Sequence, residues 1–160
     1  MSEESVRAWL RSHAPDLRLI EAHDTTATVQ DAARTLGVTP GEIAKTLTVR
    51  AGDHLFLLVT RGDARLDNRK CKDALGARPR MLGAEETLEV TGHPVGGVCP
   101  FGLRTSLPVY LDVSLQAFSI VYPAGGSLNT SVECPTERLF DLVGDRWLDL
   151  CNLPVETIGT

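Results

Sequence analysis

The sequence predicts an α+β fold in which helices flank a mixed β-sheet. Helical and strand-like segments are intermixed along the 160 residues, and short turns join several of the strands. Short turns favour antiparallel pairing, whereas a doubly wound parallel sheet needs a helical crossover between its strands. Neither an internal repeat nor a Pro/Ser-rich linker interrupts the chain, so we expect a single domain over residues 1–160.

The first quarter of the chain predicts two helices, one strand and a short helical turn. Apolar residues recur at helical spacing over 4–13, and residues 17–22 alternate as in a short strand. Thr28 opens the second helix with a sequence that resembles a capping box. Thr39 is the N-cap of the short helix, with Pro at the first helical position and Glu three positions after the cap.

The middle of the chain predicts a β-hairpin and two more helices. Residues 46–51 and 54–60 are expected to be strands, joined by a Gly-Asp turn. The second of these strands is almost wholly apolar, so we expect it to be buried. Helices are expected over 67–76, where Asp is the N-cap and Gly ends the helix, and over 84–90.

The last part of the chain predicts a long loop, three strands and a final helix. Residues 91–107 form the loop, which is rich in Gly and Pro. Pro135 starts an amphipathic helix, and a further helical turn is expected over 147–151. The three strands before that helix are expected at 109–113, 118–122 and 128–134.

Composition and charge are those of an ordinary globular protein with an acidic total. Hydrophobic residues make up 42% and charged residues 23%, and 16 basic against 21 acidic side chains give a net charge of −5. That total argues against a polybasic coat for nucleic acid or membrane. The sequence has no apolar run of membrane-spanning length and no apolar signal core. We therefore expect a cytoplasmic protein with neither DNA nor a membrane as a partner.

The acidic total hides a basic segment. Residues 61–80 hold seven basic and three acidic side chains, a net charge of +4. Such a segment is either a solvated helix face or a surface that guides a nucleic acid toward its site. The candidate nucleic-acid contacts within it are Arg61, Arg65, Arg69, Lys70 and Lys72.

Motifs for metal binding and for nucleophilic catalysis are missing from the sequence. Its four cysteines and four histidines form no CxxC, HxxxH or HExxH pattern, so we expect neither a metal site nor a disulfide framework. The G-x-S-x-G, Walker A and G-x-G-x-x-G patterns are absent as well. We expect most of the thiols to be small buried hydrophobic groups.

Lys45 is the first candidate functional residue. It lies where a short helix is expected to give way to a buried strand. A lysine at such a junction either extends its ammonium to water or directs it into a cleft. In a cleft it would attract an anionic or electron-rich group, such as a phosphate, an ester oxygen or an oxyanion.

The Gly- and Pro-rich loop is the second candidate. Its Gly96-Gly97 pair would let the backbone approach a ligand and present N–H groups, which suits an oxyanion or a phosphate. Phe101 near the end of the loop either stacks on a flat ligand or belongs to the core. A second glycine pair, Gly125-Gly126, precedes a later strand. It is either another place where the backbone approaches a ligand or a hairpin turn.

Several blocks of sequence form a pattern that is more specific than any one motif, because the order and the spacing of the blocks both agree with it. They are Ile43-Ala-Lys45-Thr46-Leu, Arg65-Leu-Asp67, Ala74-Leu-Gly76-Ala77, Val95-Gly-Gly-Val-Cys-Pro-Phe-Gly102, and Gly125-Gly126 with Ser131. This combination resembles the YbaK/prolyl-tRNA-editing family of free-standing aminoacyl-tRNA deacylases, which are related to the editing insert of bacterial prolyl-tRNA synthetase. The resemblance runs from about Ala22 to Leu142 and implies a compact α+β domain with a mixed sheet.

The resemblance implies an activity on tRNA. Members of the family hydrolyse the ester that joins a wrong amino acid to the 3′ end of a tRNA, and they use neither metal nor cofactor. A synthetase pocket separates side chains that differ by one methylene by only about 1–3 kcal/mol, so a second site must remove the errors. The implied partners are a misacylated tRNA and a prolyl-tRNA synthetase.

The resemblance also implies roles for individual residues. Lys45 matches the family's functionally important lysine, expected to hold the terminal ribose or phosphate and the ester. Gly96 matches the glycine whose N–H faces the scissile carbonyl, with Gly97 beside it. Water attacks that carbonyl, and a group on the substrate is the candidate general base. The implied substrate-binding residues are Thr46, His93, Val98, Pro100, Phe101, Gly125, Gly126 and Ser131.

Departures from the family pattern leave the substrate open. Ser131 stands where cysteine-specific members often carry an aspartate, Glu21 stands about where some relatives have a tyrosine, and His93-Pro94 differs from several relatives. Cys-tRNA(Pro) is therefore one option beside tRNAs carrying Ala, Ser or Thr. Two other functions stay open. One is a non-catalytic module that binds tRNA or a synthetase, and the other is hydrolysis of a small ester or thioester, with Lys45 binding a carboxylate.

Overall fold

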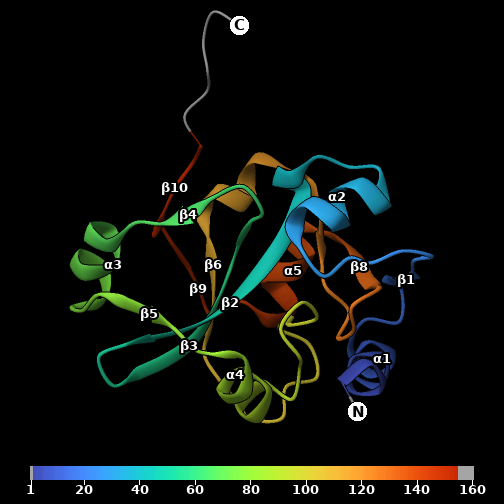
Figure 1. Cartoon of the computed structure of the whole chain (residues 1–160), viewed down its shortest axis with the longest axis horizontal. Helices are drawn as coiled ribbons and strands as arrows, with labels where there is room; N and C mark the ends of the chain where they lie inside the picture. The colour runs from blue at the N-terminus through green and yellow to red at the C-terminus, as the bar shows by residue number, and fades with distance from the viewer. Residues whose placement is uncertain (1, 155–160) are drawn as a thin grey trace, which may run out of the picture.

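The computed structural model describes residues 2–154 and is organised around a mixed β-sheet (Figure 1). The strands of this sheet are β1 (Arg18–Glu21), β2 (Ile43–Ala51), β3 (His54–Arg61), β5 (Pro79–Met81), β6 (Val109–Asp112), β7 (Ile120–Pro123), β8 (Thr130–Pro135) and β9 (Arg146–Leu148). Their order is β1-β8-β7-β2-β3-β6-β9, and β5 pairs with one end of β2. β2 is antiparallel to β3 and β5 but parallel to β7, which confirms the predicted α+β fold with a mixed sheet.

Helices lie around this sheet (Figure 1). They are α1 (Ser2–His13), α2 (Val29–Leu36), α3 (Asn68–Leu75), α4 (Ala84–Thr91) and α5 (Thr136–Val143), with the 3₁₀ turns η1 (Pro40–Glu42) and η2 (Val113–Ala117). A separate ribbon pairs β4 (Arg65–Leu66) with β10 (Cys151–Asn152). None of the helices between residues 2 and 154 is long and apolar enough to cross a membrane.

The predicted capping signals set the ends of the early helices. The Thr28 hydroxyl accepts a hydrogen bond from the Asp31 amide at 3.0 Å, and Gly37 ends α2 in a left-handed conformation with φ 71°. At η1, the Glu42 carboxylate accepts from the Thr39 amide at 3.0 Å, as the capping box requires. Local sequence therefore decides where these helices begin and end.

The central β2–β3 hairpin separates two hydrophobic clusters. Successive side chains of a strand point to opposite faces. Leu57 and Val59 of β3 therefore pack in one cluster together with side chains of α1 and α5. Phe56 and Leu58 pack in the other cluster, with Cys71 of α3. All four cysteines are buried and free, which confirms the expectation for the thiols.

Two sequence predictions near these strands are wrong. β2 begins at Ile43 rather than at residue 46, so Lys45 lies inside the strand and not at a helix–strand junction. The helical turn expected over 147–151 is absent, and this segment contributes to β9 and β10. Tertiary packing explains the second error. Trp147 stacks on Phe140 with ring centroids 5.1 Å apart, and the parallel pairing with β6 holds the segment extended.

Candidate functional site

A gap in the sheet beside β2 forms one wall of a cavity. β2 pairs with β3 from residue 44 to residue 51, but its other edge meets β7 only at residues 43–44 and β5 only at residues 49–51. Within the described part of the chain, residues 45–48 therefore have a paired strand on one side only. A cavity of about 230 Å³ lies against them, bordered by the segment before α2, the Gly-rich loop and the β7–β8 region.

The structure brings together five of the predicted site residues. Lys45, Thr46, Gly96, Val98 and Ser131 line the cavity, although they come from three distant segments of the chain. The remaining predicted substrate contacts and the second glycine of the loop lie outside the lining. These are His93, Gly97, Pro100, Phe101, Gly125 and Gly126.

Lys45 is half-buried and has a neutral partner. Its Nζ donates to the Ala64 carbonyl oxygen at 2.6 Å, and no carboxylate of the described residues lies within ion-pair distance of it. Burial lowers the pKa of Lys45; Cys151 and the Asp63 carboxylate oppose this shift, and the nearby Arg65 adds to it. The ammonium is thus poorly solvated and not neutralised by an ion pair, which favours binding of an anion or an electron-rich oxygen.

Strand alternation places the Lys45 side chain on the opposite face of β2 from Thr46. Lys45 is paired with Thr60 of β3, whereas Thr46 is paired with Val59. Val59 belongs to the hydrophobic cluster that includes side chains of α1 and α5. In the structure the ammonium therefore lies at the Ala64 carbonyl, on the opposite face of β2 from the Thr46 side chain. Its flexible stem allows it to exchange the Ala64 carbonyl for a substrate oxygen.

The two loop glycines differ in what their amides can do. The Gly97 amide donates to the Pro94 carbonyl oxygen at 2.9 Å, so it is not free for a ligand. The Gly96 amide has no backbone acceptor among residues 2–154, and Gly96 lines the cavity at φ 96°. Gly97 acts in packing, because a Cβ there would lie 2.8 Å from the backbone of Gly126. Gly96 is therefore the glycine placed to present an N–H group.

Phe101 belongs to the core and does not face a ligand. Its side chain is fully buried in the same cluster as Val59, and its ring lies 5.3 Å from that of Trp9 on α1. Of the two alternatives that the sequence left open, the structure shows the core position. Pro100, its neighbour, is also buried.

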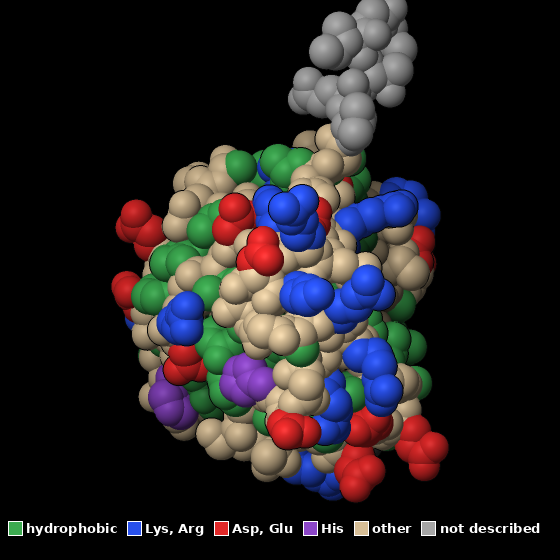
Figure 2. Space-filling view, turned by 90° about the vertical axis from the view of Figure 1, so that its left-hand side faces the viewer, with side chains coloured by type: hydrophobic (Ala, Val, Ile, Leu, Met, Phe, Trp, Pro, Cys, Tyr) green, Lys and Arg blue, Asp and Glu red, His purple; other side chains and the backbone are tan. Residues whose placement is uncertain are grey.

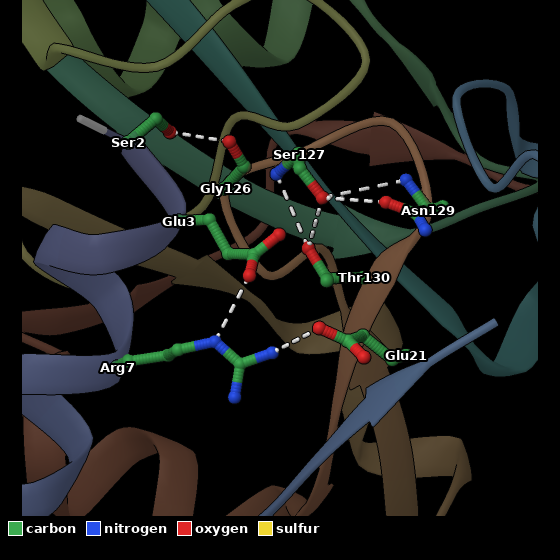
Figure 3. Close-up of polar contacts among 8 residues, drawn as sticks. All are labelled: Ser2, Glu3, Arg7, Glu21, Gly126, Ser127, Asn129 and Thr130. Carbon is green, nitrogen blue, oxygen red and sulfur yellow. Dashed lines mark hydrogen bonds and ion pairs between the residues drawn. The ribbon is translucent and has the colours of Figure 1, made fainter.

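His93 anchors the Gly-rich loop from the inside. The ring is fully buried, with Nε2 2.7 Å from the Phe101 carbonyl oxygen and Nδ1 2.6 Å from the Ser2 hydroxyl. Because a carbonyl oxygen only accepts, Nε2 carries the proton in the neutral ring. The Ser2 hydroxyl also contacts the Gly126 carbonyl (Figure 3), so α1, the loop and the β7–β8 turn are held together at one point.

We expect the stability of the fold to fall as the pH drops below about 6.5 because of His93. Burial lowers the pKa of His93, and the hydrogen bond to Phe101 only partly opposes this shift. Between the folded and unfolded pKa values the unfolded chain binds more protons, so the free energy of unfolding rises with pH there. Urea denaturation of wild type and His93→Gln at about pH 7.5 and 5.5 measures this slope.

The exposed His23 provides the matched control for that measurement. We expect His93→Gln to be less stable overall but to have a flatter pH dependence, whereas His23→Gln keeps the slope of the wild type. An unchanged slope in His93→Gln would contradict a neutral buried imidazole.

Gly125 and Gly126 belong to the turn between β7 and β8, as the hairpin alternative predicts. The Gly125 amide donates to the Thr130 carbonyl at 2.9 Å, and the hydroxyls of Ser127 and Thr130 lie 2.7 Å apart (Figure 3). A Cβ at Gly125 would lie 2.8 Å from the Thr130 hydroxyl. The turn therefore needs small residues to close. Its Gly126 packs against Gly97 of the Gly-rich loop.

Glu21 lies in an ion-pair network away from the cavity. Arg7 of α1 pairs with Glu21 at 2.6 Å and with Glu3 at 2.9 Å (Figure 3). Glu21 is exposed and does not line the cavity. It therefore ties β1 to α1.

The basic segment forms a surface around α3 and β5. Figure 2 views the molecule from this side and shows Lys and Arg side chains spread over the face, with fewer acidic ones between them. Two of the candidate tRNA contacts have acidic partners, Arg61 with Asp63 at 2.6 Å and Lys70 with Asp149 at 3.0 Å. The candidates that are exposed and have no ion pair within the described chain are Arg65, Arg69 and Lys72.

Sequence reasoning missed several residues of the cavity wall. Thr48 lies two positions after Thr46 on the same face of β2, so strand alternation was the signal that could have found it. Thr26 comes from the segment before α2, which no motif marked. The hydroxyls of all three threonines are buried without a hydrogen-bond partner among residues 2–154, which makes this wall polar and unsatisfied.

The side chains around the cavity limit its chemistry. One lysine and several hydroxyl groups line it, but the described lining holds no carboxylate, imidazole or thiol. No cluster of His, Cys, Asp and Glu within residues 2–154 is arranged to hold a metal ion. The arrangement can bind an anion or a polarised carbonyl, through the ammonium and the Gly96 N–H, more readily than it can supply a protein base.

Comparison with known proteins shows which family the chain matches. Residues 23–142 match the model of the aminoacyl-tRNA editing domain. The uncharacterized protein YwhH of Bacillus subtilis is 43% identical over 154 residues, which are 95% of this chain and 98% of that protein. A proline–tRNA ligase of Bacillus licheniformis is 31% identical over 93 residues, which are 58% of this chain and 16% of the ligase.

Solved structures agree with the sequence matches. The crystal structure of "a putative trans-editing enzyme for prolyl tRNA synthetase" superposes with a TM-score of 0.86 at 32% identity and covers 94% of this chain and 97% of that one. The family model alone spans most of the sequence and includes every residue of the cavity lining. The chain therefore belongs to the family of aminoacyl-tRNA editing domains.

Proposed function

We propose that the protein is a trans-editing hydrolase that cleaves the ester of a misacylated tRNA of the prolyl-tRNA editing type. The observation that supports this most directly is the convergence of Lys45, Gly96 and Ser131 on one small cavity in a chain of the editing-domain family. We place the reaction in the cytoplasm, where tRNAs are charged.

The proposed reaction needs no protein base. Water adds to the ester carbonyl, the bond to the ribose oxygen breaks, and the products are the free amino acid and a tRNA with a free terminal hydroxyl. The Gly96 N–H donates to the developing oxyanion, and Lys45 holds the ribose or phosphate and the ester. Since the described lining holds no carboxylate or imidazole, a hydroxyl of the substrate is the proposed base. Neither metal nor cofactor takes part.

The size and lining of the cavity fit an aminoacyl group. A volume of about 230 Å³ is enough to hold the aminoacyl group of the ester. Ser131 is 2% exposed and stands in the wall with Thr46 and Val98, so the site lacks the acidic group of the cysteine-specific pattern. We propose Cys, Ala, Ser or Thr as the amino acid removed.

The basic surface is the proposed path for the tRNA. β5 connects α3 to the cavity, because Met81 at its end lines the cavity while Arg80 precedes it on the strand. Arg65, Arg69 and Lys72 are thus placed to contact phosphates of the acceptor stem as the 3′ end enters. A prolyl-tRNA synthetase is the proposed partner that adds affinity for the tRNA.

A panel of mischarged tRNAs tests the function. Purified protein at micromolar concentration is mixed with tRNA(Pro) carrying Cys, Ala, Ser, Thr or Pro, and single-turnover hydrolysis is followed. We expect at least one mischarged tRNA to be deacylated and correctly charged Pro-tRNA(Pro) to be spared. If all the mischarged tRNAs stay intact but bind, the protein is a non-catalytic module of the same fold.

Salt dependence separates tRNA editing from hydrolysis of a small ester. Phosphate contacts make the logarithm of the affinity fall linearly with the logarithm of salt concentration, whereas a small neutral ester lacks this dependence. We expect the affinity of the protein for its tRNA substrate to fall steeply as the salt concentration rises.

A further inference from the structure

The open edge of β2 exposes main-chain groups in a defined direction. The Leu82 amide donates to the Thr48 carbonyl oxygen at 3.0 Å, so the main chain of Thr48 faces the β5 side of β2. In an antiparallel ladder, alternate residues turn both their N–H and their C=O to the same side. The N–H and C=O of Thr46 therefore point to the same side as those of Thr48, whereas the N–H and C=O of Lys45 and of Leu47 point toward β3.

At Thr46 this edge has no strand to pair with. β7 stops pairing at Ala44, β5 pairs only from Val49 onward, and Leu82, the residue after β5, bonds to Thr48. Within the described chain, the N–H and the C=O of Thr46 thus have no main-chain partner, and Thr46 lines the cavity. One residue of β2 offers a donor and an acceptor, side by side, to whatever occupies this space.

We propose that Thr46 binds the aminoacyl group through its main chain, as one residue of an antiparallel strand binds another. An amino acid ester carries an α-ammonium donor and a carbonyl acceptor on adjacent carbons, the same arrangement as in a peptide residue. The ammonium donates to the Thr46 C=O, and the ester carbonyl accepts from the Thr46 N–H. This inference rests on the proposed function and deepens it by naming how the α-amino group is recognised.

The polarity of the cavity supports this assignment. A buried ammonium needs hydrogen-bond acceptors, and the described lining contains no Asp or Glu. Main-chain carbonyls and hydroxyls are the acceptors that remain, and Thr46 provides one with a donor beside it. Because the contact uses only atoms common to all α-amino acids, it holds the ester in place whatever the side chain is.

Two stable analogues test the contact with the ammonium. In 3′-alanylamido-3′-deoxyadenosine an amide replaces the ester, and the propionylamido analogue lacks only the α-amino group. We expect calorimetry to show about tenfold or more weaker binding of the propionyl compound, because a buried carbonyl then loses a charged donor. Equal affinities, or no measurable affinity for either compound, would overturn the proposal.

Two proline variants test the main-chain geometry. Thr46→Pro removes an N–H that pairs with no strand, whereas Leu47→Pro removes an N–H that faces Leu58 of β3. We expect Thr46→Pro to stay folded and to bind the alanyl analogue about tenfold or more weakly, because the carbonyl loses its donor. We expect Leu47→Pro to be much less stable. Equal destabilisation of the two variants would show that the Thr46 amide already has a partner, and would overturn the proposal.

The inference and the proposed function can fail separately. Hydrolysis of the mischarged tRNAs together with equal affinities for the two analogues overturns only the role of Thr46. Discrimination between the analogues, without hydrolysis of any mischarged tRNA, keeps the Thr46 contact and overturns the catalytic function.

Discussion

Replacing Lys45 by methionine is expected to lower single-turnover hydrolysis of misacylated tRNA by roughly 100-fold or more with the fold intact. Methionine keeps an unbranched apolar stem of similar length but removes the ammonium. In the native protein this ammonium is half-buried, bonded to the Ala64 carbonyl at 2.6 Å and without an ion-pair partner in residues 2–154. A cation in that state interacts strongly with a substrate oxygen, so its loss should affect the rate more than the structure.

Stability measurements separate this effect from unfolding. Burial lowers the pKa of Lys45, so the protonated side chain opposes folding at neutral pH. That cost is relieved as the pH rises from the folded pKa toward the value in the unfolded chain. Lys45→Met removes the cost but leaves the Ala64 carbonyl without its donor, so we expect Tm to change by only a few degrees.

A surface cation provides the control for the loss of charge. Arg11 is exposed near the end of α1, and Arg11→Met should keep the rate of the wild type. If Lys45→Met hydrolyses the best mischarged tRNA at nearly the native rate, Lys45 has no role in the reaction. If both variants lose activity equally, the effect reflects net charge and not the position of Lys45.

Local signals in the sequence predict the helices of this fold better than its strand ends. Thr28 and Gly37 determine the ends of α2 through contacts within a few residues, so their effect is visible in sequence. The start of β2 at Ile43 depends on pairing with Tyr122, almost eighty positions away. The 147–151 segment is extended because β6 lies beside it, which no local pattern shows.

The candidate site was predictable only in part, because local signals mark some of its residues and distant segments position the others. Lys45 and Gly96 stood out because a lysine next to a buried strand and a paired glycine are unusual locally. The cavity itself depends on where β7 stops and β5 begins along β2, and this register is set by distant segments. His93 and Phe101 lie in the same loop as Gly96, yet their burial against α1 is a tertiary fact. Sequence alone could not separate the residues that line the cavity from those that support the loop.

Gly96→Ala is expected to lower the hydrolysis rate by about 100-fold or more, for a geometric reason. Gly96 has φ 96°, which an L side chain rarely adopts. A Cβ there would lie 2.8 Å from Leu128 and 3.1 Å from the Ala27 side chain, so the loop must shift away from the cavity wall. The Gly96 N–H then moves from the position where it meets the oxyanion, and single-turnover rates with the best mischarged tRNA measure the loss.

Gly37→Ala separates strain from catalysis. Gly37 also has a positive φ, 71°, but a Cβ there meets nothing within 4 Å, and the residue does not line the cavity. We expect Gly37→Ala to lose about 1–2 kcal/mol of unfolding free energy and to keep its rate, because only the backbone conformation is penalised. Gly96→Ala should lose at least as much stability and most of its activity. If Gly96→Ala is less stable but hydrolyses tRNA as fast as Gly37→Ala, the Gly96 amide does not stabilise the oxyanion and another donor must.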